Sequence, residues 1–187
     1  MKTKIIAVVM SGVIALVSGC SNVRVNAKPQ APSVSSKHDI VVEAASTREG
    51  MNVGSHYWKA EPSHLYAFPS DNTVFDRKQI VTHSPGVEYL VRFKQPGTYY
   101  LWVKGKGEAG GASVIPGLDG IPLAENSDFM GFFPGEFSWI GGLHDSGKRT
   151  ELRIDTAGKH RVNFWMLEDG FRFQKFMITA DSNLIPD

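Results

Sequence analysis

Residues 98–104, TYYLWVK, decide the fold class of this chain of 187 residues. Their side chains alternate between two faces, with Tyr99, Leu101 and Val103 on one face and Tyr100, Trp102 and Lys104 on the other. A period of two with aromatic and β-branched residues is typical of a β-strand. The dipeptide Pro96-Gly97 just before the stretch is a turn signal. The stretch therefore predicts a strand that starts at a turn and packs one face against a core.

Short stretches of the same kind recur along the chain. We expect further strands at residues 40–45, 87–94, 112–118, 150–154, 160–166 and 171–179. Turns rich in Gly and Pro separate them, and no stretch has a convincing helical period. In the last strand we place Phe173 on one face and Phe176 on the other, and we expect residues 176–178 to be buried on both faces. The pattern predicts an all-β fold, a sandwich or a barrel.

Two aromatic stretches, residues 49–76 and 126–142, are too irregular to be predicted as strands. We expect them to be long loops. Loops of this length in a compact domain are usually functional or packed over the edge of a core.

The first twenty residues resemble the signal peptide of a bacterial lipoprotein. Lys2 and Lys4 precede an apolar run at 5–17, which is shorter than the roughly 20 residues that span a bilayer. The tetrapeptide VSGC then places Cys20 where lipoproteins carry their lipid. We expect residues 1–19 to be removed and Cys20 to be lipidated, with palmitate among its acyl chains. The alternative is an ordinary signal peptide with an incidental cysteine.

The position after the cysteine bears on localisation. Ser21 stands where Asp would indicate retention in the inner membrane of enteric bacteria. The resemblance therefore implies a lipid-anchored protein of the cell envelope, in the outer membrane of a Gram-negative bacterium. Residues 20–37 are rich in Pro, Ser, Asn and Lys, and we expect them to be a disordered linker.

Residues 38–187 are long enough for one domain with a full core. Cys20 is the single cysteine of the chain, so this domain has to be stabilised by burial without disulfides. The chain has 20 basic and 19 acidic residues, and five of the basic ones lie before residue 38 whereas all the acidic ones follow it. The domain is therefore mildly acidic, and we do not expect nucleic-acid binding. Binding of an anionic polysaccharide by a local cluster of basic residues stays open.

Five motifs occur in an order that resembles a known group of domains. They are GTYYLWV at 97–103, GLDG at 117–120, FSW at 137–139, AGKH at 157–160 and EDGFR at 168–172. In this order they are similar to jelly-roll domains of the galactose-binding-like superfamily. That group includes carbohydrate-binding modules of families 6 and 35 and the C-terminal domain of family 115 glycoside hydrolases. The resemblance covers roughly residues 39–181, and it implies a jelly-roll β-sandwich that binds glycans without catalysis.

Many of these domains hold a structural calcium ion between the first and last strands. By resemblance, Glu43 and Asp181 are the candidate ligands here. Ala45 replaces a second acidic residue of the pattern, and Gln174 stands where relatives often have Asp. No other cofactor is expected.

A sugar site combines an aromatic ring for the apolar face of a pyranose with a few polar groups for its hydroxyls. Trp139, in the Gly-rich stretch FSWIGG, is our first candidate for the ring. Trp58 is the second, with Tyr57 and Tyr66 near it in sequence. The alternative for all of these rings is packing at the edge of the core.

The polar candidates are Asp119, Glu168, Asp169 and Arg172. We place the last three at a turn between two strands, where the ligand loops of the resembled family gather. Arg172 can form a fork of hydrogen bonds to a carboxylate or to two hydroxyls. The alternative for Asp119 and Asp169 is turn geometry alone, because each precedes a Gly.

These features predict a non-catalytic lipoprotein that binds polysaccharide or oligosaccharide. The chain has no nucleophile-elbow motif, and its histidines show no metal-ligand spacing. Two alternatives stay open. One is a structural or protein-interaction lipoprotein with envelope proteins as partners. The other is a small polysaccharide hydrolase or lyase, which would need two carboxyl groups at a distance that a sequence does not give.

Overall fold

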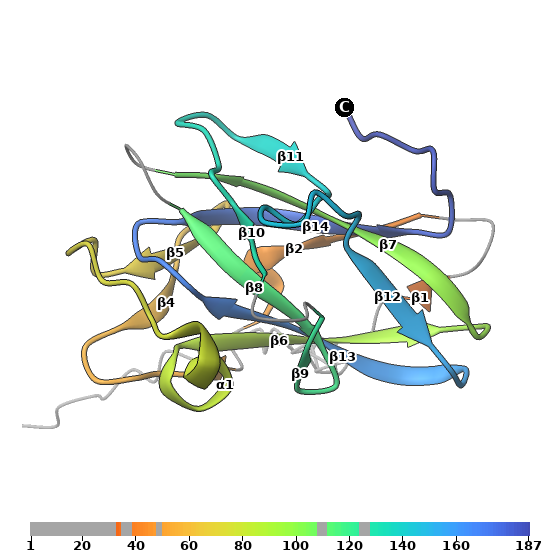
Figure 1. Cartoon of the computed structure of the whole chain (residues 1–187), viewed down its shortest axis with the longest axis horizontal. Helices are drawn as coiled ribbons and strands as arrows, with labels where there is room; N and C mark the ends of the chain where they lie inside the picture. Colours follow the sequence, from red (N-terminus) through yellow and green to blue (C-terminus); the bar gives the residue numbers. More distant parts are fainter. Residues whose placement is uncertain (1–32, 35–38, 48–49, 108–111, 124–127) are drawn as a thin grey trace, which may run out of the picture. The chain divides into compact units, whose positions relative to one another are not determined.

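The computed structural model describes residues 33–34, 39–47, 50–107, 112–123 and 128–187 (Figure 1). The predicted signal peptide, Cys20 and most of the predicted linker lie outside these residues. No helix of the described part is long and apolar enough to cross a membrane. The fold below is that of the compact unit Ala31–Asp187.

The described strands form two sheets. Sheet 1 consists of β1 (Ser33–Val34), β3 (Gly50–Met51), β6 (Gly86–Phe93), β8 (Ser113–Leu118), β9 (Ile121–Pro122), β10 (Met130–Gly131) and β13 (Gly158–Met166). Sheet 2 consists of β2 (Ile40–Glu43), β4 (Tyr57–Ala60), β5 (Leu65–Phe68), β7 (Gly97–Lys106), β11 (Ser138–Ile140), β12 (Glu151–Ile154) and β14 (Arg172–Thr179).

The strand order confirms the predicted jelly-roll sandwich. Sheet 1 runs β1-β6-β13-β8-β10, with β3 on β6 and β9 on β8. Sheet 2 runs β11-β7-β14-β5-β4, with β12 on β7 and β2 on β14. The chain changes sheet at each step from β6 to β7 to β8, and again from β12 to β13 to β14 (Figure 1). The pairings are antiparallel except for that of β1 with β6.

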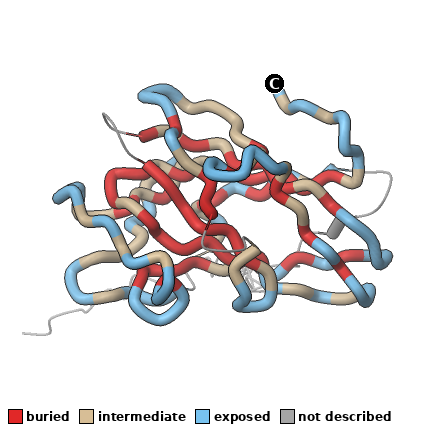
Figure 2. Tube along the Cα trace, in the orientation of Figure 1, coloured by how far each residue is buried: buried red, intermediate tan, exposed pale blue. Residues whose placement is uncertain are grey.

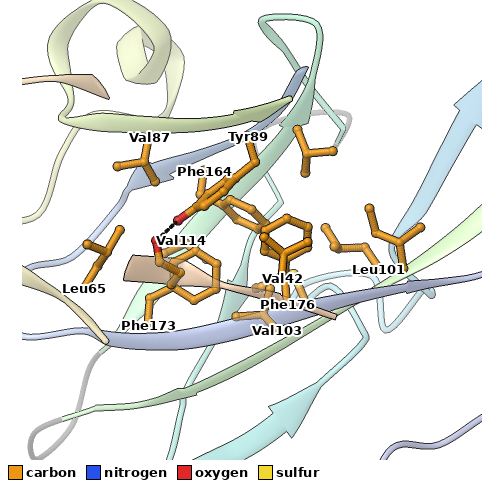
Figure 3. Packing of buried hydrophobic residues seen from close by; sticks show 14 of the residues in the cluster. Val42, Leu65, Val87, Tyr89, Leu101, Val103, Val114, Phe164, Phe173 and Phe176 are labelled. Atoms are coloured by element: carbon orange, nitrogen blue, oxygen red, sulfur yellow. Dashed lines mark hydrogen bonds between the residues drawn. The ribbon is translucent and has the colours of Figure 1, made fainter. Parts of the chain in front are cut away.

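The core lies between the inner faces of the two sheets, where Figure 2 shows the buried residues in red. In β7 the predicted alternation is confirmed, because Tyr99, Leu101 and Val103 are buried in this core. Figure 3 shows how Tyr89 from sheet 1 meets Phe173 of sheet 2. Burying each large apolar side chain stabilises the fold by roughly 1.5–3 kcal/mol.

One polar group is satisfied inside this core. The Tyr89 hydroxyl donates to the carbonyl oxygen of Ala44 at 2.8 Å, the dashed line in Figure 3. Ala44 belongs to the 3-10 helix η1 (Ala44–Ser46), which follows β2. The bond ties η1 to the middle of β6.

Strand β14 departs from the predicted alternation. The register of β14 against β7 shifts between Phe173 and Lys175. The bulge adds one residue, so Phe176 returns to the core face with Phe173, and the prediction of opposite faces is wrong. Burial of both faces at residues 176–178 is confirmed, since Met177 on the outer side is also buried.

The two stretches predicted as loops contain short strands. β4 and β5 pair as a hairpin within residues 49–76, and β10 and β11 pair with β8 and β7. Their two to four residues are too few for a period to stand out in the sequence, and neighbouring strands supply the hydrogen bonds that fix them. Ser33–Val34, within the predicted linker, is also a short strand, and it pairs in parallel with β6.

The outer faces of the two sheets differ. On sheet 1, α1 (Ile80–His83), which follows η2 (Arg77–Gln79), and the segment around Phe129 cover Ile115 and Trp165 in a second apolar cluster. On sheet 2, outward side chains such as Tyr66 and Lys106 are half-buried. Functional groups on sheet 2 can therefore reach a ligand.

Candidate functional site

The outer face of sheet 2 carries a row of four side chains from four neighbouring strands. Lys59 of β4 pairs with Tyr66 of β5, Tyr66 pairs with Arg172 of β14, and Arg172 pairs with Lys106 of β7. Directly opposite residues of neighbouring strands share a face, with Cβ atoms about 4.5–5.5 Å apart. We call Lys59, Tyr66, Arg172 and Lys106 the cross-strand row.

Aromatic rings lie under the cations of this face. The guanidinium carbon of Arg172 is 4.4 Å from the centre of the Tyr66 ring. The ammonium nitrogen of Lys106 is 5.1 Å from the centre of the Phe137 ring. Two residues before Lys106 on β7, Lys104 lies opposite Trp139 of β11. Its ammonium nitrogen is 5.5 Å from the centre of the Trp139 ring. These cation–π contacts orient both groups, and each stabilises by roughly 0.5–1 kcal/mol on a protein surface.

Two titratable groups lie beside the row. Glu61 pairs with Lys59 at 2.7 Å, and their hydrogen bond raises the pKa of Lys59 and lowers that of Glu61. The His64 ring lies 5.8 Å from the Phe137 ring, centre to centre. Burial lowers the pKa of His64, and the charges of Arg172 and Lys106 lower it further. His64 is therefore neutral at pH 7, whereas the row is positively charged.

Three of the predicted rings lie on this outer face. Tyr66 belongs to the row itself, and Tyr57 packs on Phe68 with ring centres 5.2 Å apart. Trp139 is half-buried on the edge strand β11, and its indole N–H donates to the carbonyl oxygen of Asp187 at 2.9 Å. Together with Arg172, four of the eight predicted ligand residues come together on one surface.

Trp58 lies on the other side of β4. Its indole N–H donates to the carbonyl oxygen of Pro85 at 3.2 Å, and its ring meets Phe171 and Phe173 edge-on. This is packing at the edge of the core, the alternative left open for this residue. Trp58 and Tyr57 also line a hollow of about 340 Å³ between β4 and the start of β6.

The three predicted carboxylates lie away from the row. Glu168 accepts a hydrogen bond from the Ser113 hydroxyl at 2.7 Å. Asp169 is buried, and it accepts from the backbone N–H groups of Asp71 at 2.5 Å and Thr73 at 3.2 Å. Asp169 thus holds the preceding loop in place and is not aimed at the outer face of sheet 2.

Asp119 lies at the other end of β8 from Ser113. It has a positive φ of 51° in the turn between β8 and β9. Its carboxylate bonds to the His160 ring at 2.6 Å and accepts from the backbone N–H of Arg161 at 2.8 Å. Burial works to lower the pKa of His160, but the hydrogen bonds to Asp119 and to the Thr156 carbonyl raise it overall. The structure therefore gives Asp119 a role in the turn.

The sequence-based prediction missed Lys59, Lys104, Lys106, His64 and Phe137. Lys104 was placed on the face opposite the core but not assigned to the site, and Lys106 continues the same alternation, so the outward position of both follows from the sequence. That of Lys59 does not, because residues 57–60 were not identified as a strand.

The two predicted calcium ligands are far apart. Glu43 pairs in register with Lys175, whereas Asp181 follows the other end of β14, six residues further on. At about 3.3 Å per residue this is roughly 20 Å, and calcium ligands lie within 2.6 Å of the ion. Glu43 and Asp181 therefore do not form one calcium site, and the expected calcium finds no support there.

A different cluster of possible metal ligands is present. One ligand atom each of His56, Asp71 and Asp169 lies within 4.8 Å of the others. The hydrogen bond from the Thr73 hydroxyl holds the pKa of Asp71 well below its usual range, whereas burial raises the pKa of Asp169. Both carboxylates already accept hydrogen bonds within the loop, which is sufficient to account for their positions.

No protein-family model matches the chain. One curated relative, "Uncharacterized protein P23" of Formosa agariphila, is 32% identical over 155 residues. The alignment covers 71% of this chain and 36% of the relative, so the chain spans about a third of that protein's length. The activity and partners of the whole relative do not follow for this chain.

Several solved structures are similar in fold. A family 35 carbohydrate-binding module of Paenibacillus barcinonensis matches with a TM-score of 0.49 and 12% identity, covering 76% of this chain and 99% of the module. The C-terminal family 6 module of a marine laminarinase of Zobellia galactanivorans has a TM-score of 0.49, 10% identity and the same coverage. The mannanase of Podospora anserina with a family 35 module has a TM-score of 0.49 and 12% identity, covering 79% of this chain and 29% of that protein. These likenesses do not assign a ligand to this chain.

Proposed function

We propose that this chain is a non-catalytic glycan-binding protein and that the outer face of sheet 2 is its binding surface. One observation carries the proposal: aromatic rings lie against cations on this face, with Arg172 on Tyr66 and Lys106 on Phe137. Such rings can stack on the apolar face of a sugar. The guanidinium and ammonium groups beside them donate hydrogen bonds to its hydroxyls.

The chemistry of the face favours binding over catalysis. Hydrolysis of a glycosidic bond needs two carboxyl groups that flank the bond. In the described residues, Glu61 is a carboxylate that is ion-paired with a member of the cross-strand row, at 2.7 Å from Lys59. Each of the four side chains of the row carries a hydrogen-bond donor.

We further propose that a lipid on Cys20 anchors the domain in the cell envelope, in the outer membrane of a Gram-negative bacterium. The support is the sequence pattern of residues 1–21, with the linker to residue 37 as a tether. Replacing Cys20 with Ala should move the protein from the membrane fraction to the soluble fraction. Continued membrane association of Cys20→Ala would contradict this anchor.

A protein partner is the second candidate, and one feature of sheet 1 favours it. Met51 and Val81 are each 38% exposed and line a hollow of about 470 Å³ with the buried Trp165. An exposed apolar surface of this kind suits a protein contact. A partner held there would leave the outer face of sheet 2 free.

Calorimetric titration of the full chain with plant, algal and bacterial polysaccharides tests the glycan proposal. We expect binding to at least one polysaccharide and a loss of about tenfold or more in affinity for Tyr66→Ala. Phe132→Ala is the matched control, because Phe132 is 55% exposed on a different surface. Binding that Tyr66→Ala and Trp139→Ala leave unchanged would contradict the assignment of this face.

A further inference from the structure

We infer that the outer face of sheet 2 selects glycans that carry negative charge, as carboxylate or sulfate groups. The inference rests on the proposed glycan binding and adds the chemical class of the ligand. It follows from how the charges of this sheet are distributed.

The four strands that carry the row hold charge of one sign. Strands β4, β5, β7 and β14 contain Lys59, Lys104, Lys106, Arg172 and Lys175, and they contain no Asp or Glu. Acidic residues outnumber basic ones in residues 38–187 as a whole. The positive charge is therefore concentrated on one face of a mildly acidic domain, and such a concentration attracts anions.

The strand register brings like charges directly opposite each other. Arg172 pairs with Lys106, and Lys175 pairs with Lys104. Like charges at directly opposite positions destabilise a sheet. A bound anion would relieve the repulsion between Lys104 and Lys175.

Nearby carboxylates neutralise only part of the positive charge of this face. Lys59 pairs with Glu61 at 2.7 Å, and Lys175 lies 3.9 Å from Glu43. For Lys104 and Lys106, no carboxylate lies within 4 Å in the part of the chain that the structure describes, and rings are their neighbours. On sheet 1, Arg161 is paired with Glu88 at 3.1 Å, whereas Arg92 lies directly opposite Lys159.

The rings indicate that the anion belongs to a sugar chain. Tyr66, Phe137 and Trp139 each lie against one of these cations, so a ligand that stacks on a ring meets a positive charge. With strands about 4.8 Å apart, the row from β4 to β7 spans about 14 Å. A linear acidic oligosaccharide can cover this distance with more than one sugar ring.

Matched pairs of polymers test the inference. The full chain is titrated with polygalacturonate and its methyl-esterified form, and with dextran sulfate and dextran, at two salt concentrations. We expect binding to at least one charged polymer, weaker or absent binding to its neutral twin, and loss of affinity as salt rises. Lys104→Gln with Lys106→Gln should lower affinity about tenfold or more.

Lys159→Gln is the matched control, because Lys159 is exposed on β13 of sheet 1. It should leave affinity unchanged, and thermal unfolding of each variant shows whether it is folded. Equal binding of charged and neutral twins, or equal effects of the lysine variants and the control, would overturn the charge selection but leave glycan binding in place. Binding to no glycan in the wider panel would overturn both. The same titrations are repeated with vesicles that contain phosphatidylglycerol. If these vesicles bind as tightly as the charged polymers and lose affinity in the same lysine variants, the inference that the ligand is a glycan would be overturned.

Discussion

The guanidinium carbon of Arg172 lies 4.4 Å from the centre of the Tyr66 ring, across the boundary between β14 and β5. The two residues are directly opposite each other, so the contact follows from the register of the strands. It holds a planar cation and an aromatic ring side by side at the centre of the cross-strand row. The contact predicts a measurable coupling between the two side chains.

A double-mutant cycle with Tyr66→Ala and Arg172→Ala measures that coupling. We expect the two changes in unfolding free energy to be non-additive by about 0.5–1 kcal/mol, because either substitution removes the same cation–π contact. Urea unfolding of the four proteins gives the value. Pairing Arg172→Ala with Tyr57→Ala is the control and should be closer to additive. Strict additivity for Tyr66 and Arg172 would show that the contact does not stabilise the fold.

His64 reports the electrostatic potential of the row. Burial, and then the positive charges of Arg172 and Lys106, hold the pKa of its imidazole below its ordinary value. Lys106→Gln removes one of these charges and should raise the pKa of His64. Binding of polygalacturonate should raise it too, since a nearby anion favours the protonated ring. NMR titration of the ring protons measures both, and a pKa that neither change moves would contradict the described potential.

The pair of His160 and Asp119 makes stability depend on pH. Hydrogen bonds to Asp119 and Thr156 raise the pKa of His160 in the folded protein above its unfolded value. The folded state therefore binds a proton more tightly, and this stabilisation is present below about pH 6.5 and is lost as pH rises through the folded pKa. His160→Gln should lose more stability at pH 5.5 than at pH 8.5, measured by urea unfolding. An equal loss at both pH values would contradict the raised pKa.

Tyr89→Phe tests the polar contact inside the core. The substitution removes the hydroxyl that donates to the Ala44 carbonyl at 2.8 Å and leaves a buried acceptor without that donor. We expect a loss of about 1–2 kcal/mol of unfolding free energy. Tyr57→Phe, on the half-buried outer face, should change stability by much less. Equal effects of the two substitutions would show that η1 does not depend on this bond.

The core strands were predictable because their pattern is local. In β7 every second residue is apolar, and the structure buries the predicted Tyr99, Leu101 and Val103. The bulge at Phe173–Lys175 was not predictable, because an inserted residue leaves no mark on the residue types around it. Phe176 was therefore assigned to the wrong face.

The candidate site was predictable only in part. Tyr66, Arg172 and Trp139 were singled out by residue type, which is suited to sugar contacts. The alignment of Tyr66 and Arg172 with Lys59 and Lys106 depends on the register of the β4–β5 hairpin against β14 and β7, which are far from the hairpin in sequence. The prediction brought Glu43 and Asp181 together, but the structure separates them. β2 and β14 are neighbours, yet their register puts Glu43 opposite Lys175, and Asp181 follows the other end of β14.

Mapping a bound glycan by NMR tests the central claim most directly. The protein is labelled with ¹⁵N and titrated with an oligosaccharide of polygalacturonate, and the shifts of backbone and side-chain signals are followed. We predict that the largest shifts occur at Lys59, Tyr66, Lys106 and Arg172 on the outer face of sheet 2. Shifts confined to the hollow lined by Trp58 or to the surface around Phe132, with the row unchanged, would contradict the claim.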